Sequence, residues 1–295
     1  MYKALSLNSS LAKSYYVLST LKDSYQNKRW QDTVLSEKII HNKNNEALVN
    51  IYFARANIFH KNKLFKDSMD SLKKANNIKF KSNSSKALDL IKKSNYLYVR
   101  SENLNITKDY PTNSFQSIFI VGMPRSGTTL LESILAMNKE VQPLGEINIF
   151  EESFLDLSIL SDYSNLNNIY YTKVSNIIDK HSSLTNKWLY NYQYAGFIAA
   201  KISNSKIIHC FRNPLDNILS IYRAHFSRGN EYSSSLVDSA KVYLDHDDIM
   251  SKYKKRFRSS IYDLDYDLLV KSPERTIKDL INWLGWTWND SYLKP

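Results

Sequence analysis

One stretch of this chain predicts a strand, a loop and a helix in direct succession. Residues 116–132 read Gln-Ser-Ile-Phe-Ile-Val-Gly-Met-Pro-Arg-Ser-Gly-Thr-Thr-Leu-Leu-Glu. The four apolar residues at 118–121 run without alternation, which is typical of a parallel strand buried on both faces. A loop then runs from Gly122 to Gly127, and apolar residues recur with helical spacing after it. This order leaves unpaired backbone N–H groups at a helix N-terminus, where they bind phosphate-like anions.

The loop has the spacing of the P-loop pattern G-x-x-x-x-G-K-[ST], except that Thr128 stands in place of the lysine. Kinases and ATPases use that lysine to reach the β- and γ-phosphates of the nucleotide. Here the cation lies inside the loop as Arg125, and Ser126, Thr128 and Thr129 add hydroxyl groups that can donate hydrogen bonds. The loop therefore favours a phosphate or sulfate whose transfer does not use the usual lysine and magnesium.

Residues 119–130, Phe-Ile-Val-Gly-Met-Pro-Arg-Ser-Gly-Thr-Thr-Leu, resemble the 5′-phosphosulfate-binding loop of sulfotransferases that use 3′-phosphoadenosine 5′-phosphosulfate (PAPS). The similarity is to bacterial tetratricopeptide-repeat (TPR) sulfotransferases and to tyrosylprotein sulfotransferases, and P-R-S-G-T-T after an apolar strand is a specific signal. It implies PAPS as co-substrate. It also implies that the donor is bound by Arg125, Ser126, Gly127, Thr128 and Thr129.

A second anion site is expected after residues 206–211, which predict another buried strand ending at Arg212. Family members place an arginine there and a serine eight residues later on the adenosine 3′-phosphate, and Arg212 and Ser220 have that spacing. A later stretch, 260–274, resembles the family strand that ends in Y-E-x-L-V-x-x-P-E, with Asp267 for the glutamate. The resemblance implies that Tyr266 packs against the nucleotide, and plain core packing is the alternative.

Glu146 is the candidate catalytic base. Pro143 and Gly145 place it on a loop or strand end, from which a side chain can face a cleft. In the tyrosylprotein relatives a glutamate after a glycine at this distance from the loop is the base, and a carboxylate can take the proton of an acceptor hydroxyl. The alternative is a glutamate that caps the following helix. Glu151 and Glu152 lie nearby without a motif.

Lys187 is the second candidate catalytic residue. Residues 185–191 resemble the family segment K-x-P-x-N, with Leu189 in place of the proline. The resemblance implies that Lys187 lies near the transferred sulfonate and stabilises charge on the bridging oxygen. An ordinary surface lysine is the alternative.

The N-terminal part of the chain predicts an all-α region. Residues 49–80 alternate large and small side chains as a TPR does, at Tyr52, Ala56, Phe59, Ser68, Leu72 and Ala75. We expect such helices either to form a groove for a partner or an acceptor peptide, or to cap the catalytic domain. The predicted domains are a TPR-like region at 1–102, a linker at 103–114, and an α/β sulfotransferase domain at 115–295 with a P-loop-like parallel sheet flanked by helices.

Charge and cysteine content narrow the possible partners. The net charge is +11, yet no compact basic run resembles a nucleic-acid tract, so no nucleic-acid partner is expected. Cys210 is the only cysteine, which excludes a disulfide framework. His209 lies within a predicted strand and is expected in the core; for His246 a solvated helix face is favoured over a metal site. Without a leader or a spanning segment, a soluble cytoplasmic protein is the expectation.

Family members usually continue with a Ser/Arg/Gly-containing segment that closes over the nucleotide, whereas this chain ends at Pro295. We therefore expect the sulfotransferase domain to be short at its C-terminus. A truncated gene, an enzyme that closes its site otherwise and impaired activity are the three explanations that the sequence leaves open.

Together these features predict transfer of a sulfonate group from PAPS to an acceptor hydroxyl, without a metal. Protein tyrosine is the first acceptor that the resemblance implies, ahead of carbohydrate or small-molecule hydroxyls. One rival is a P-loop nucleotide kinase or NTPase in which Asp263 or Asp265 binds magnesium. The other is a non-catalytic TPR interaction protein with a degenerate nucleotide-binding domain.

Overall fold

The computed structural model of the chain describes residues 2–8, 11–21, 29–106, 115–158, 163–178, 182–226 and 229–295. They form two compact units. Unit 1 combines Met1–Ala87 with Leu219–Ala240, and unit 2 combines Leu88–Ile218 with Lys241–Pro295. The chain therefore passes between the units three times, after Ala87 and within helices α11 (Pro214–Arg223) and α12 (Leu236–Arg256).

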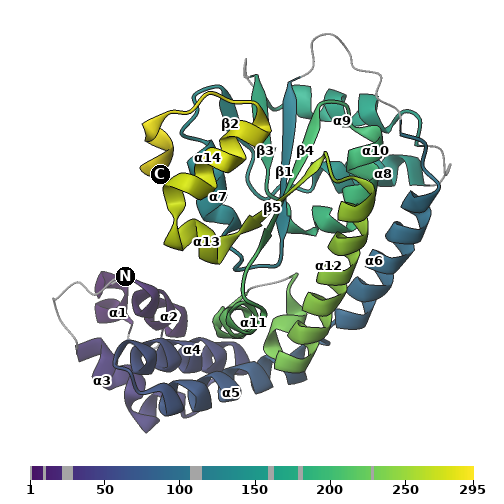
Figure 1. Ribbon diagram of the computed structural model, residues 1–295. Helices are drawn as coiled ribbons and strands as arrows, with labels where there is room; N and C mark the ends of the chain where they lie inside the picture. Colours follow the sequence, from purple (N-terminus) through teal and green to yellow (C-terminus); the bar gives the residue numbers. More distant parts are fainter. Residues whose placement is uncertain are drawn as a thin grey trace. The chain divides into compact units, whose positions relative to one another are not determined.

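Unit 2 is built on a sheet of five parallel strands in the spatial order β2-β3-β1-β4-β5 (Figure 1). The strands are β1 (Gln116–Gly122), β2 (Val141–Pro143), β3 (Ser183–Asn186), β4 (Ser205–Phe211) and β5 (Ile261–Asp265). Parallel neighbours require crossover connections, and the intervening helices provide them on the two faces of the sheet. The predicted α/β fold with a parallel sheet is confirmed.

Strand β1 is buried on both faces, as the apolar run predicts. Ile118 and Ile120 belong to one core cluster, with side chains from α7 (Thr128–Leu135), α13 (Tyr266–Lys271), α14 (Pro273–Leu284) and η4 (Asp290–Leu293). Phe119 and Val121 belong to the opposite cluster, with side chains from α6 (Ala87–Glu102), α8 (Ile149–Ser158), α9 (Leu166–Ser175), η2 (Leu189–Tyr194), α10 (Ala195–Lys201) and α12. Successive strand residues point to opposite faces, so one run supplies two cores.

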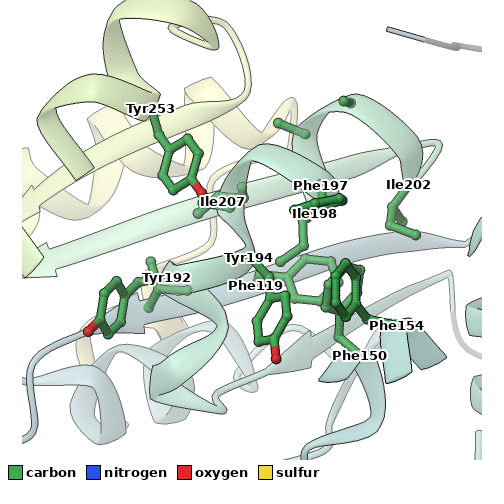
Figure 2. Packing of buried hydrophobic residues seen from close by; sticks show 14 of the residues in the cluster. Phe119, Phe150, Phe154, Tyr192, Tyr194, Phe197, Ile198, Ile202, Ile207 and Tyr253 are labelled. Carbon is green, nitrogen blue, oxygen red and sulfur yellow. The ribbon is translucent and has the colours of Figure 1, made fainter. Parts of the chain in front are cut away.

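Aromatic side chains dominate the second of these clusters (Figure 2). Phe154 stacks on Tyr163 with ring centroids 5.0 Å apart, and Phe197 meets Phe154 edge to face at 4.8 Å. Tyr194 contacts Phe154 at 5.1 Å and donates a hydrogen bond to Glu151 through its hydroxyl (3.0 Å). Such pairs each contribute about 0.5–1.5 kcal/mol beyond area burial. These contacts join α8 to α10 and to η2.

Helix α6 packs with the sheet unit. Gln193 donates from its side-chain amide to the carbonyl of Leu90 (3.1 Å) and to the hydroxyl of Ser94 (3.0 Å). Arg256 donates to the carbonyls of Ser101 (2.7 Å) and Leu104 (2.8 Å), which satisfies acceptors at the end of α6. Unit 2 thus begins at Leu88, whereas the predicted limits placed residues up to 102 in the N-terminal region. Most of the predicted linker, 103–114, lies outside the described residues.

Unit 1 is helical, and its central hairpin is formed by α4 and α5. Its elements are α1 (Tyr2–Leu7), α2 (Ala12–Thr20), α3 (Arg29–Leu35), η1 (Glu37–Ile40), α4 (Asn45–Lys61), α5 (Phe65–Ser82) and η3 (Glu231–Ser234), with parts of α11 and α12. The hydroxyl of Ser68 donates to the carbonyl of Ala56 (2.8 Å), and Leu72 and Ala75 are buried. The predicted N-terminal helical region is confirmed. Its assignment to the TPR class stays a prediction.

A segment from the middle of the chain occupies part of the face of this hairpin. Asn76 on α5 donates from its amide to the carbonyl of Tyr222 (2.9 Å), and Lys79 donates to the carbonyl of Phe226 (2.9 Å). His225 stacks on Phe53 of α4 with ring centroids 4.7 Å apart and an interplanar angle of 7°. Asn76 and Lys79 therefore bind the backbone of the chain itself.

His209 and His246 are both buried, although only His209 was expected in the core. His209 lies in the core, as predicted. His246 is also buried, with 2% of its surface exposed, so its placement on a solvated helix face was wrong. The ring of Tyr192 meets the His246 ring edge to face at 4.7 Å, and His209 lies 5.0 Å from it. Burial lowers the pKa of both imidazoles below the usual value.

Candidate active site

All five strands point their carboxyl ends to the same edge of the sheet, because every pair is parallel. In open α/β sheets this edge is where ligands bind. The anion loop follows β1, Arg212 follows β4 and Tyr266 follows β5. Glu146 and Lys187 follow β2 and β3. The fold therefore places nearly all of the predicted site residues along one edge of unit 2.

Close packing against main chain and side chain shapes the anion loop. A Cβ atom at Gly122 would lie 2.4 Å from the carbonyl oxygen of Cys210 on β4. A Cβ at Gly127 would lie 2.2 Å from the ring of Tyr266, and Gly127 has φ +89°. Arg125 itself adopts the left-handed conformation, with φ 71°. Only glycine fits at the two ends of this loop, which explains the spacing in the sequence.

The polar groups of the loop suit an anion. Gly127 is the N-cap of α7 and supplies no side-chain hydrogen bond, so the first N–H groups of the helix have no side-chain cap. The hydroxyl of Ser126 is buried and has no hydrogen-bond partner among the described residues. Thr128 is buried at the helix start, whereas Arg125 and Thr129 are exposed. Main-chain donors, serine and threonine hydroxyls and one arginine thus follow β1 within a few residues of each other.

Arg212 is held at the end of β4 by an aromatic ring and two carboxylates. Its guanidinium lies over the ring of Tyr266, 5.1 Å from the centroid. Asp216 and Asp267 each lie 3.9 Å from one of its nitrogens. Its Nε is buried and makes no hydrogen bond within the described part of the chain. An oriented guanidinium with a spare donor is suited to bind an anionic oxygen.

Tyr266 connects three parts of the site. Its ring covers Gly127 and lies beneath Arg212, and the residue begins α13 directly after β5. Both earlier interpretations of this residue fit the arrangement, since the ring packs against protein and also lies beside the anion loop. Asp267 adds a further contact, because its carboxylate accepts a hydrogen bond from the backbone N–H of Asn213 (3.0 Å).

Ser220 is the one predicted donor-site residue outside unit 2. It lies in the part of α11 that belongs to unit 1. Its role on the 3′-phosphate stays a prediction from the spacing to Arg212.

Glu146 and Lys187 form an ion pair. Lys187 Nζ donates to Glu146 Oε1 at 2.6 Å, and the two side chains are 6% and 60% exposed. Lys187 is therefore not the surface lysine of the alternative interpretation. Its backbone N–H donates to the carbonyl of Gly145 (2.8 Å), which brings the ends of β2 and β3 together. A buried ammonium beside an exposed carboxylate gives this edge both a cation and a base.

The neighbouring acidic residues have other partners. Glu151 pairs with Lys93 on α6 and accepts from Tyr194.

Asp263 on β5, one of the two aspartates of the rival magnesium interpretation, accepts from Lys254 (3.0 Å) and Arg258 (3.2 Å) and contacts His209 (3.1 Å). Burial of the Asp263 carboxyl opposes its ionisation, but the hydrogen bonds from His209 and Lys254 outweigh burial and lower its pKa.

The second aspartate of the rival nucleotide-hydrolysing interpretation also has a structural role. Asp265 is the N-cap of α13 and accepts from the backbone N–H groups of Asp267 (2.8 Å) and Leu268 (3.2 Å). Both proposed magnesium ligands therefore have hydrogen-bond partners within the protein. Among the residues that the structure describes, no group of three or more His, Cys, Asp or Glu side chains is placed to hold a metal ion.

The sequence did not reveal several residues that position the site. Asn217 on α11 is fully buried and donates to the carbonyl of Pro124 in the anion loop (3.1 Å). Glu132 on α7 accepts from Gly145 and Thr185, beside the ion pair. These contacts join segments far apart in the chain, and no local pattern signals them.

Residues 117–290 match the model of the sulfotransferase family. An uncharacterized protein of Aquifex aeolicus (strain VF5) is 30% identical over 207 residues, which are 61% of this chain and 27% of that protein. The chain thus spans about a quarter of that relative's length.

Two solved structures with some likeness are also sulfotransferases. The sulfotransferase domain from the curacin biosynthetic pathway has 18% sequence identity and a TM-score of 0.47, over 62% of this chain and 78% of that one. Mouse sulfotransferase SULT7A1 complexed with PAP (adenosine 3′,5′-bisphosphate) has 16% identity and a TM-score of 0.38, over 67% and 66%. The segment matched by the family model makes up more than half of the chain and contains the anion loop, the ion pair and Arg212. The protein therefore belongs to the sulfotransferase family.

Proposed function

We propose that this sulfotransferase takes its sulfonate group from PAPS and transfers it to an acceptor hydroxyl. The proposal rests on two groups of residues that lie at the same edge of the sheet, namely the anion loop and the Lys187–Glu146 ion pair. The anion loop lies at the end of β1, and the Lys187–Glu146 ion pair lies at the ends of the neighbouring strands β3 and β2. One group binds an anionic donor, and the other supplies a cation and a base.

The donor would be bound at two anionic groups. Arg125, the hydroxyls of Ser126, Thr128 and Thr129, and the first N–H groups of α7 are suited to the 5′-phosphosulfate. Arg212, with Ser220 as a further prediction, is suited to the 3′-phosphate. The Ser126 hydroxyl and Arg212 Nε have no hydrogen-bond partner in the described part of the chain and are donors that such a ligand would satisfy.

The ion pair would act on the acceptor. The acceptor oxygen forms a bond to sulfur, the bond from sulfur to the bridging oxygen breaks, and the electron pair stays on the leaving phosphate. Glu146 takes the proton of the acceptor hydroxyl. Lys187 stabilises the charge that grows on the bridging oxygen, and its burial strengthens that interaction because little water screens it.

For the acceptor we propose protein tyrosine first, with carbohydrate and small-molecule hydroxyls as the other classes. Support for tyrosine comes from the motif around Glu146, which resembles that of tyrosylprotein sulfotransferases. An acceptor peptide in the hairpin of unit 1 is less favoured, since Asn76 and Lys79 already bind the backbone of the chain there.

Calorimetric titration with PAP tests the donor site. We expect micromolar binding by the wild-type chain and a tenfold or larger loss in both Arg125→Ala and Arg212→Ala, about 1.4 kcal/mol or more. Arg258→Ala is the matched control, because this exposed arginine precedes β5 and lies at the opposite edge of the sheet. Equal losses in all three variants would show a general charge effect. Failure of the wild-type chain to bind PAP would refute the proposed donor.

A further inference from the structure

Glu132 bridges the two groups of residues of the active site. It lies on α7, the helix that begins at the anion loop, and its Oε1 accepts two hydrogen bonds. One comes from the backbone N–H of Gly145 (3.2 Å), the residue before Glu146. The other comes from the hydroxyl of Thr185 (3.1 Å), two residues before Lys187.

The other hydrogen bonds that the structure describes for the loop that carries Glu146 run to β3 and to the residue after it. Leu144 donates its N–H to the carbonyl of Thr185 (2.9 Å), and the Lys187 N–H donates to the carbonyl of Gly145 (2.8 Å). Asn186 donates its side-chain amide to the carbonyl of Ile147 (3.0 Å). These bonds join the loop to β3. The Glu132 carboxylate joins it to the helix of the anion loop.

The contact to Gly145 is demanding in geometry. Gly145 has φ +66°, a left-handed conformation that residues other than glycine rarely adopt. A carboxylate oxygen is the stronger kind of acceptor, and hydrogen bonds to charged groups contribute more than neutral ones. One oxygen that receives both a main-chain and a hydroxyl donor therefore defines the positions of two strand ends at once.

We propose that Glu132 is a positioning residue for sulfonyl transfer. It sets the distance between the donor bound in the anion loop and the Glu146–Lys187 pair, and it touches no reacting atom. This inference rests on the proposed function, because it assigns the ion pair to the transfer step. In-line transfer depends on the separation of the reacting groups, and a displacement of about 1 Å can cost on the order of 100-fold in rate.

Kinetics of Glu132→Ala and Glu132→Gln test the inference, with PAPS as donor and a panel of phenols and tyrosine peptides as acceptors. We expect Glu132→Ala to lower kcat about 10- to 100-fold while its affinity for PAP changes less than about twofold. Glu132→Gln should retain most of the activity, because an amide oxygen can accept the same two hydrogen bonds. Glu140→Ala is the control, since this exposed glutamate follows the same helix.

A double-mutant cycle separates positioning from general damage to the fold. If Glu132 acts through Glu146, Glu132→Ala should have little further effect in a Glu146→Gln background. Additive losses would overturn the inference. Thr185→Val removes one donor without touching α7 and should give a smaller loss in kcat of the same kind.

A pair of crystal structures with PAP gives an answer that needs no acceptor. We expect the Gly145–Glu146 segment of Glu132→Ala to move relative to the bound PAP, and an unmoved segment would overturn the inference. If the wild-type chain binds no PAP, the proposed donor fails, and a displaced segment in Glu132→Ala without ligand would still support the bridge. These results distinguish failure of the bridge from failure of the proposed function.

Discussion

The two halves of the active site, the donor half and the transfer half, depend on different features of the chain. The donor half, at the ends of β1, β4 and β5, depends on close packing at two glycines, since Gly122 and Gly127 admit the carbonyl of Cys210 and the ring of Tyr266. The transfer half, at the ends of β2 and β3, depends on the side chains of Lys187 and Glu146. We therefore expect the donor half to fail when atoms are added at its glycines, as well as when its arginines are removed, whereas the transfer half should fail only when functional groups are removed.

Glu146→Gln should produce the largest effect and should confine it to the transfer half. Loss of the base lowers kcat by about 100- to 10,000-fold, because no positioned group then takes the proton from the hydroxyl of the substrate. Affinity for PAP should stay within about twofold of the wild type. Steady-state kinetics together with PAP titration measure both quantities. Glu152→Gln, an exposed neighbour on α8, is the control.

If Glu152→Gln lost as much activity as Glu146→Gln, the assignment of the base would be wrong. If Glu146→Gln weakened PAP binding as strongly as it lowered kcat, the separation of the two halves would not hold.

Gly127→Ala should damage the donor half through steric conflict. The new methyl would meet the Tyr266 ring at 2.2 Å in a left-handed backbone, so the loop, the ring or both must move. We expect at least a tenfold loss of PAP affinity and a loss of about 1–3 kcal/mol in the free energy of unfolding. Titration with PAP and denaturant unfolding measure these changes.

Gly285→Ala provides a matched control for the backbone contribution. Gly285 also has a left-handed conformation, with φ +80°, but its Cβ would meet nothing within 4 Å. We expect it to cost roughly 1 kcal/mol in stability and to leave PAP affinity unchanged. Equal PAP affinities for Gly127→Ala and Gly285→Ala would contradict the steric account of the donor half.

The smallest expected effect concerns the histidines beside the donor half. Burial lowers the pKa of His209, on the strand that leads to Arg212, and that of His246 on α12. The unfolded chain binds more protons at these sites below pH about 6.5, so the free energy of unfolding should fall as the pH drops from 7 to 5. The loss is on the order of 1 kcal/mol for each imidazole.

Denaturant unfolding across this pH range measures the slope, and His246→Gln should flatten it. Burial and nearby lysines also lower the pKa of His225 in unit 1, to about 4, so His225→Gln serves as a comparison for that unit. The lowered pKa of Asp263 acts only at lower pH, because stability from a depressed carboxyl is lost below pH about 4. An unchanged slope in His246→Gln would show that its neutral state contributes nothing to stability.

Local pattern was sufficient for several features of this chain. The unbroken apolar run at 118–121 predicted a strand that supplies two cores, and Gly122 and Gly127 marked the ends of the anion loop. The pattern of large and small side chains at 49–80 predicted helices in the region that contains α4 and α5. Each of these depends on neighbours in the chain, which a sequence displays directly.

Other features depend on contacts between segments that are distant in the chain. The pairing of Lys187 with Glu146 requires β2 to lie beside β3, and the bridge from Glu132 requires β3 to lie beside β1. Strand order is not written in local periodicity. A face of α12 that looked polar buries His246 because Tyr192 and His209 pack there.

The sequence by itself determined the family, the α/β class and the anion loop, since these rest on short-range pattern and on a motif with a local backbone requirement. Only the tertiary structure decided that Lys187 is buried, that α6 packs with the sheet unit and that Leu219–Ala240 belongs to unit 1. The physical reason is that the packing of the whole chain sets burial and side-chain partners. A local sequence pattern is compatible with many such packings.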